Sequence, residues 1–105
     1  MNDSISVFKP EGIIDTAGGA QIRQDVSDRL EAGVETILID LTNISFMDSS
    51  GLGAMVVTLQ RVRSKGAKLY LCSLNDQLKI ILELTKMDKV FDILPDRAAF
   101  DAVIV

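Results

Sequence analysis

The sequence of 105 residues contains no histidine, no tryptophan and a single cysteine, Cys72. Without histidine a Ser-His-Asp triad is excluded, although serine–lysine variants stay open. One cysteine without histidine rules out a disulfide within the chain and argues against a zinc site. These absences exclude a histidine-dependent hydrolase, and we expect no bound cofactor.

Long apolar runs, nucleotide-binding loops and clustered basic residues are also missing. No run approaches the roughly 20 residues that span a bilayer, and the N-terminus lacks the basic and then apolar pattern of a signal peptide. No G-x-x-x-x-G-K-[ST] loop occurs. The net charge of −4 disfavours nucleic acid, because phosphate contacts need clustered Lys and Arg. We expect a cytoplasmic protein that binds neither nucleic acid nor membrane.

What is present is a balanced globular composition, 48% hydrophobic, that fits one domain over residues 1–105. Apolar and β-branched runs predict strands at residues 5–8, extended briefly over 12–15, and at 36–41 and 68–72, with a short extended or turn segment at 90–94. Helical spacing predicts helices at residues 18–32, at 50–65, from Asn75 or Asp76 to before Asp88, and after Pro95 and Asp96. The alternation predicts an α/β fold: a small, mainly parallel sheet of about four strands, with amphipathic helices packed mostly on one face.

The most informative stretch is FMDSSGLG, residues 46–53, between a predicted strand and a predicted helix. Asp48, Ser49 and Ser50 would lie where the helix begins, beside unpaired backbone N–H groups and the positive end of its dipole, which suits a phosphate. Asp48 or Ser49 could equally serve only as the helix cap. Gly51 and Gly53 cost helix stability, which indicates close approach of either a neighbouring loop or a kinase active site.

These residues resemble the STAS family, named for sulfate transporters and anti-sigma factor antagonists, and specifically its small bacterial antagonist branch. The core of the resemblance is ILIDLTNISFMDSSGLGAMV, supported by GIID at residues 12–15, KLYLCSLN and LELTKMDKVFDIL. The antagonists usually carry an additional strand before the one that leads into the G-x-hydrophobe-Asp turn. The segment here is short, so the strand count stays open.

The resemblance implies that Ser49 is phosphorylated by a partner serine kinase that is also an anti-sigma factor, and dephosphorylated by a separate phosphatase. The unphosphorylated chain would bind the kinase and thereby regulate transcription or a related output. ATP would arrive with the kinase, so the resemblance implies that this chain is the switch and not an enzyme.

Around Ser49, we expect Asp48, Ser50, Gly51 and Met47 to shape its presentation. Met47 and Leu52 could supply apolar contact to the partner, although Leu52 also fits a core position. Asp15 either borders the serine or merely caps the first helix.

Two alternatives stay open. A phosphorelay receiver would use Asp40, but the first strand lacks the acidic pair that binds its metal. A structural STAS subunit of a transporter or sensory assembly would use the same turn as an unmodified docking surface. The oligomeric state is not determined by the sequence.

Overall fold

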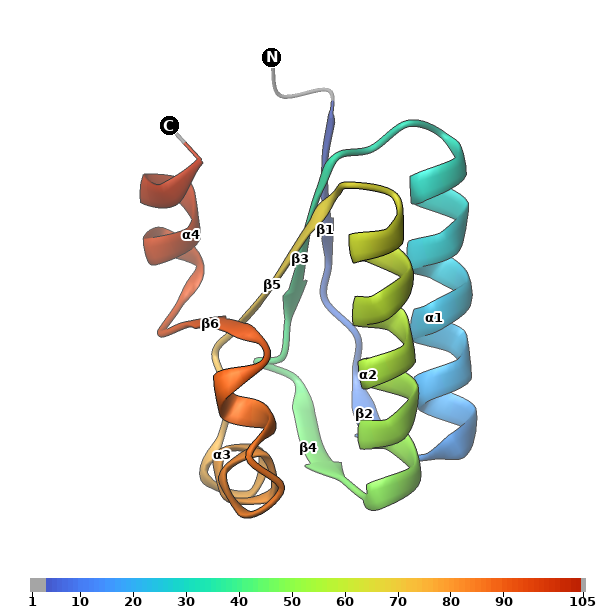
Figure 1. Cartoon of the computed structure of the whole chain (residues 1–105). Helices are drawn as coiled ribbons and strands as arrows, with labels where there is room; N and C mark the ends of the chain where they lie inside the picture. The colour runs from blue at the N-terminus through green and yellow to red at the C-terminus, as the bar shows by residue number, and fades with distance from the viewer. Residues whose placement is uncertain (1–3, 105) are drawn as a thin grey trace.

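The main sheet contains four parallel strands in the order β1-β3-β5-β6. The computed structural model describes residues 4–104. The strands are β1 (Ile5–Phe8), β3 (Thr36–Asp40), β5 (Lys68–Cys72) and β6 (Asp92–Leu94) (Figure 1). Residues 37–40 of the central strand β3 are buried, because it has a neighbour on each side and helices over both faces. The predicted parallel α/β sheet is confirmed.

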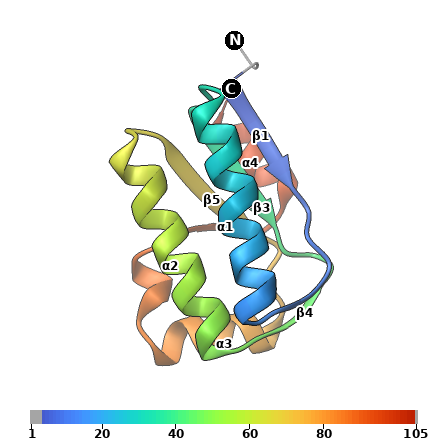
Figure 2. The same cartoon turned by 90° about the vertical axis from the view of Figure 1, so that its right-hand side faces the viewer.

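Two long helices, α1 (Thr16–Glu31) and α2 (Ser49–Ser64), lie side by side on one face of this sheet (Figure 2). The predicted stripe of Ile22, Val26 and Leu30 is buried, as the helical spacing requires. Helix α1 begins two residues earlier than expected, since Asp15 caps it. Both helices begin at the carboxyl-terminal end of the sheet, so their N-termini are neighbours.

The remaining helices cover other parts of the sheet. Helix α3 (Asp76–Leu84) lies at the carboxyl-terminal end of the strands, below the sheet in Figure 1, and is followed by a 3₁₀ turn, Met87–Lys89. Helix α4 (Arg97–Val103) lies on the face opposite α1 and α2. There Phe100 packs on Leu38 and Cys72 in a small second cluster. The helices thus lie mostly, but not entirely, on one face.

A second, two-stranded parallel sheet was not predicted. It pairs β2 (Gly12–Ile14) with β4 (Ile44–Met47). The first predicted strand therefore does not continue through residues 12–15: the chain leaves the main sheet after Phe8 and forms a separate strand. The described residues contain six strands, and β1 precedes the strand that leads into the turn at Asp15.

Each α-helix begins after a side chain that accepts a hydrogen bond from the backbone N–H three residues on. The caps are Asp15, Asp48, Asn75 and Asp96. Such caps satisfy donors that the first helical turn leaves free. In the described part of the chain, no helix is long and apolar enough to cross a membrane.

Candidate functional site

The turn between β4 and α2 places two serines at an exposed helix start. Asp48 is the N-cap, and its Oδ1 accepts from the Gly51 N–H at 2.8 Å. Ser49 and Ser50 are the first two residues of α2, and both are exposed. Because Asp48 caps the helix, capping does not require the hydroxyl of Ser49.

The glycines of this turn have different roles. A Cβ at Gly51 would collide with the backbone carbonyl of Ile14, whereas a Cβ at Gly53 would meet nothing within 4 Å. Close approach inside the chain therefore explains Gly51 and does not explain Gly53. Gly51 lets the start of α2 pack directly on β2.

The two serines line different hollows. Ser49 lies at the edge of a groove of about 540 Å³ between the β4–α2 turn and α3. Its lining is mostly apolar and includes Phe46, Ile80, Ile81 and Leu84. Ser50 instead borders a hollow between α1 and α2. A partner that reaches Ser49 through the groove thus meets a different surface from one that reaches Ser50.

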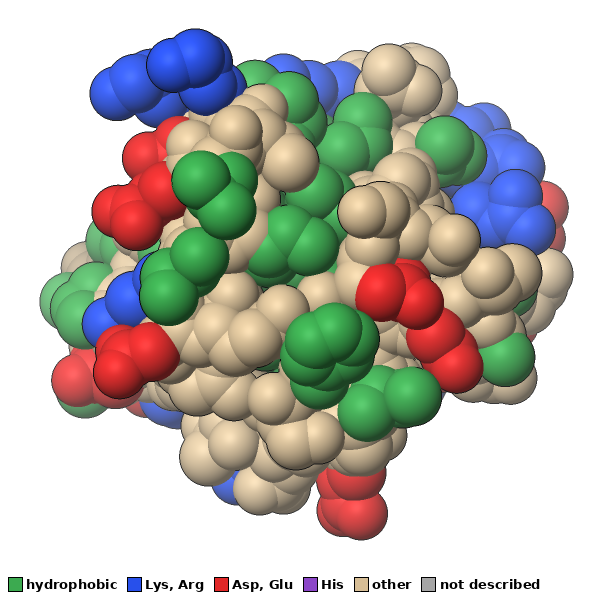
Figure 3. All heavy atoms as spheres, turned by 90° about the horizontal axis from the view of Figure 1, so that it is seen from below, with side chains coloured by type: hydrophobic (Ala, Val, Ile, Leu, Met, Phe, Trp, Pro, Cys, Tyr) green, Lys and Arg blue, Asp and Glu red, His purple; other side chains and the backbone are tan. Residues whose placement is uncertain are grey.

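Three apolar side chains of the groove stand out into solvent. The exposed fractions are 46% for Phe46, 54% for Ile80 and 79% for Leu84. Figure 3 views this end of the molecule, where hydrophobic side chains surround a hollow and acidic side chains stand beside it. Clustered exposed apolar residues of this kind are typical of interaction sites.

Sequence reasoning offered Met47 and Leu52 for the apolar contact, with the core as the alternative for Leu52. Leu52 is 6% exposed and belongs to the core, as that alternative requires. Met47 also belongs to the core; it lines the groove but, at 1% exposed, offers a partner almost no surface.

Phe46 is exposed beside the buried Met47. The burial of β4 does not alternate strictly, because its register against β2 shifts between the pairing of Gly12 with Ile44 and that of Ile13 with Phe46. The sequence did contain a signal for this groove. Ile80 and Leu84 lie one helical turn apart, and they are apolar although they lie off the buried stripe of Leu78 and Leu82.

The sequence also left open whether Asp15 lies near the serine turn. Asp15 caps α1, accepting from the Gly18 N–H at 2.8 Å. Its strand pairs with the strand that precedes Asp48, with Ile14 opposite Met47. The Asp48 N–H donates to the Ile14 carbonyl at 3.2 Å, so the two turns lie against each other. Asp15 therefore has a capping role and also stands beside the Ser49 turn.

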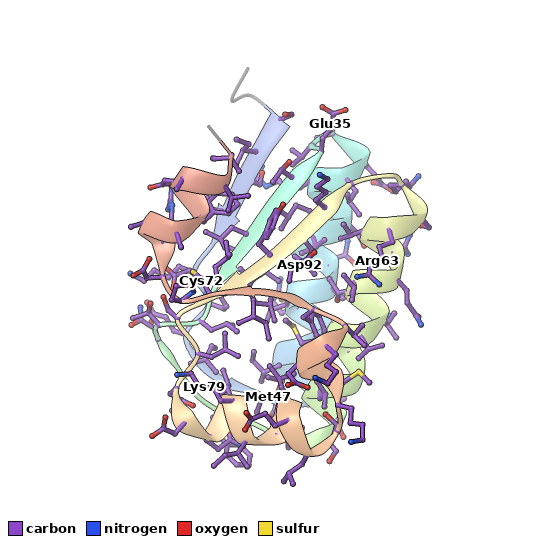
Figure 4. All side chains as sticks on the ribbon, turned by 60° about the vertical axis from the view of Figure 1, so that its left-hand side comes forward. Glu35, Met47, Arg63, Cys72, Lys79 and Asp92 are labelled. Carbon is purple, nitrogen blue, oxygen red and sulfur yellow. The ribbon has the colours of Figure 1, made fainter. Side chains whose placement is uncertain are left out.

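Side-chain amides of α3 hold the other edge of β4. Gln77 Oε1 accepts from the Met47 N–H and its Nε2 donates to the Met47 carbonyl, both at 2.9 Å. Asn75 Nδ2 donates to the carbonyls of Ile44 and Ser45 at 3.0 and 3.2 Å. Figure 4 shows Met47 at the end of the molecule where α3 lies. Neither amide was singled out from the sequence.

Asp40, the alternative phosphate acceptor, is not available. It is 6% exposed, and its Oδ1 accepts from Thr42 Oγ1 at 2.6 Å and from the Thr42 N–H at 3.0 Å. Burial alone would raise the pKa of Asp40, but these hydrogen bonds and the charges of Lys9 and Arg97 outweigh burial and lower it. The residues described contain no group of three His, Cys, Asp or Glu side chains placed to hold a metal ion. The geometry thus disfavours the receiver hypothesis.

Comparison with known proteins identifies what this arrangement resembles. The family model described as STAS domain matches residues 1–99. The anti-sigma-B factor antagonist of Staphylococcus aureus is 28% identical over 83 residues, which cover 79% of this chain and 77% of that protein.

Solved structures show the same fold. The Thermotoga maritima protein TM1081 superposes with a TM-score of 0.86 at 25% identity, covering 98% of this chain and 90% of that one. The phosphorylated form of the Bacillus cell fate determinant SpoIIAA gives 0.70 at 22% identity over 95% and 91% of the two chains. The STAS domain of a SulP transporter from Vibrio cholerae gives 0.80 at 17% identity over 99% and 84%.

Proposed function

The chain belongs to the STAS domain family, and we propose that it is an anti-sigma factor antagonist whose partner binding is switched by phosphorylation of Ser49. In its unphosphorylated form it binds an anti-sigma factor that is also a serine kinase. The kinase transfers a phosphoryl group from ATP to the Ser49 hydroxyl, and a separate phosphatase removes it. The sequence relative in Staphylococcus aureus is an anti-sigma-B factor antagonist, which supports an anti-sigma factor as the class of partner.

The observation that carries this proposal is the exposed hydroxyl of Ser49 at the edge of an apolar groove. A partner that fills the groove covers Phe46, Ile80 and Leu84 and comes directly over the serine. Apolar anchors that fill pockets supply much of the affinity of protein interfaces. The groove and the hydroxyl therefore belong to one binding surface.

Phosphorylation would oppose this binding by adding charge at the place of closest contact. A phosphoserine carries about −1.5 to −2 charges at neutral pH. Its desolvation against an apolar partner, or its repulsion by an acidic one, costs several kcal/mol. A loss of about 3 kcal/mol lowers affinity more than a hundredfold.

The fold would tolerate the modification. Ser49 is the first residue of α2, where the helix dipole and free N–H groups stabilise an anion by about 0.3 to 1 kcal/mol. Asp48 already carries the cap, so the hydroxyl can be modified without removing it. The switch then acts on the interface and leaves the domain folded.

The neighbouring residues divide into two groups. Asp48, Ser50 and Asp15 lie around the turn and border the approach to Ser49. Met47, Gly51 and Leu52 are buried and support the turn from beneath. We therefore assign the apolar partner contact to the exposed groove residues.

The second candidate is a structural STAS subunit, in which the same surface docks without modification. The fold similarity to the STAS domain of a SulP transporter is the observation that favours it. In that case the Ser49 hydroxyl would have no chemical role.

The deciding experiment incubates the purified chain with anti-sigma factor kinases of its own organism and Mg-ATP, followed by intact mass and site mapping. We expect one added phosphoryl group on Ser49, none on Ser49→Ala, and loss of kinase binding after modification. Ser50→Ala is the matched control and should be modified as the wild type is. An unchanged mass, together with partner binding that is insensitive to Ser49→Asp, would favour the structural subunit.

A further inference from the structure

The free edge of β4 is occupied by side chains instead of another strand. On one side β4 pairs with β2, and on the other the amides of Asn75 and Gln77 hydrogen-bond to its backbone. Gln77 makes a two-bond clamp on Met47, as a neighbouring strand would. The strand that leads into the serine turn is thus fixed to α3 by side chains 30 and 31 residues away in sequence.

We propose that Gln77 is a positioning residue for Ser49: its clamp on Met47 sets the serine over the groove and makes Ser49, not Ser50, the acceptor. This inference rests on the proposed function and adds the device that selects the acceptor. The kinase would bind in the groove, and Gln77 would determine which serine hydroxyl lies beside it.

The placement of the clamp supports this role. Met47 lies two residues before Ser49, and the intervening Asp48 N–H is held by the Ile14 carbonyl from the opposite side. The turn is therefore anchored to β2 on one side and to α3 on the other. Releasing the α3 side would let the turn move relative to Ile80 and Leu84, while β2 still held it. Displacements of about 1 Å at a reacting group are enough to slow a reaction by as much as a hundredfold.

The chemistry of the clamp requires a carboxamide. It must donate to one backbone oxygen and accept from one backbone N–H at the same time, which glutamine does with its two terminal atoms. An ionised glutamate accepts but does not donate, and a methionine of similar shape forms neither strong bond. These two replacements separate the hydrogen bonds from the volume that Gln77 fills in the groove.

The test compares Gln77→Met and Gln77→Glu with the wild type, using the kinase that modifies wild-type Ser49. Both variants keep the exposed apolar side chains of the groove. We expect kcat for Ser49 to fall at least tenfold in both variants and the share of phosphate on Ser50 to rise. KM should change little in Gln77→Met, whereas Gln77→Glu also places a charge in the groove and should raise KM. Reduced folding alone would lower the active concentration without changing which serine is modified. The control is Gln24→Met, which removes an exposed amide bonded to Asp28 on α1 and should behave as the wild type.

A second measurement needs no kinase. Amide hydrogen exchange should show protection lost at least tenfold in residues 44–50 of Gln77→Met, with unchanged protection in α1. In Gln77→Glu, protection of these amides should return as the pH falls through the range in which a glutamate carboxyl becomes protonated. The protonated carboxyl again donates a hydrogen bond to the Met47 carbonyl. If Gln77→Met does not fold, Gln77→Glu serves for both measurements, since it keeps the bond from the Met47 N–H.

The outcomes separate the two proposals. If no kinase modifies the wild-type protein, the proposed function is contradicted, and so is the role of Gln77 in selecting Ser49. This holds whether or not hydrogen exchange shows that Gln77 fixes Met47. Wild type modified on Ser49, with variants that keep the wild-type kcat and serine preference, overturns the role of Gln77 alone. Unchanged exchange in residues 44–50 of Gln77→Met also overturns it.

Discussion

The starts of α1 and α2 are built alike, yet only the start of α2 places an exposed hydroxyl beside the groove at α3. Each follows a strand of the small sheet, and each has an aspartate cap bonded at 2.8 Å to the N–H of a glycine three residues on. Each glycine is also confined by a carbonyl of β2: a Cβ at Gly18 would lie 2.5 Å from the Ile13 oxygen, and a Cβ at Gly51 would collide with that of Ile14.

The difference lies in what surrounds the two starts. The α2 start lies beside α3, which contributes Ile80 and Leu84 to the groove at Ser49. The α1 start has Thr16 at the equivalent position, and this hydroxyl borders the hollow between the two long helices. A capped helix start with a hydroxyl therefore does not by itself form an apolar groove, because the neighbouring helix supplies that surface.

The largest expected effect is on stability at the tighter of the two starts. Gly51→Ala drives a methyl group into the Ile14 backbone, and the free energy of unfolding should fall by about 3 kcal/mol. Gly18→Ala should cost less, because its contact is looser. Gly53→Ala should raise the free energy of unfolding by up to about 1 kcal/mol, because the new Cβ has open space and alanine favours the helix. Urea unfolding measures all three, and equal effects at Gly51 and Gly53 would contradict the packing described.

The next effect tests whether a negative charge weakens partner binding at the start of α2 only, or also at the start of α1. Phosphorylation of Ser49 should weaken kinase binding about a hundredfold, or ~3 kcal/mol, and Ser49→Asp should weaken it about tenfold. Thr16→Asp places a charge at the equivalent position of α1 and should leave binding unchanged. Calorimetric titration measures these affinities; an equal loss in Thr16→Asp would show that the partner covers both starts.

A smaller effect tests the groove. Ile80→Ser or Leu84→Ser removes an exposed apolar side chain and should weaken kinase binding about tenfold, or ~1.4 kcal/mol, through faster dissociation. Val57→Ser is the matched control, because Val57 is 45% exposed but borders the hollow on the Ser50 side. Surface plasmon resonance distinguishes the two, and a greater loss in Val57→Ser would move the interface to the α1 side.

The smallest expected effects come from removing the two helix caps. Asp15→Ala and Asp48→Ala should each lower the free energy of unfolding by about 1 kcal/mol, because each leaves one N–H of the first turn without its partner. Asp48→Ala should also change the rate of Ser49 phosphorylation, and more than Asp15→Ala does, because Asp48 adjoins the serine. Thermal unfolding and a phosphorylation time course measure the two properties, and similar phosphorylation rates in both variants would argue against a distinct role for Asp48.

Much of the fold was predictable because its signals are local. The stripe of Ile22, Val26 and Leu30 defined one helix, and the bounds of β1 and β5 agree with the apolar runs. Strand β4 was missed because its four residues are too few for a long apolar run and their burial does not alternate. Its partners, β2 and the amides of α3, are distant in sequence.

The sequence by itself placed the starts of α1 and α2 to within two residues, offered Asp15 and Asp48 as possible caps, and determined the acidic balance and the exclusion of a histidine-dependent site. Hydrogen bonds such as that from Gly51 to Asp48 span three residues and form within one turn of chain. Only the tertiary structure decided which serine faces an apolar groove. Phe46 and Leu84 come together there because α3 packs on β4, and Gln77 reaches Met47 across 30 residues only after the chain has folded.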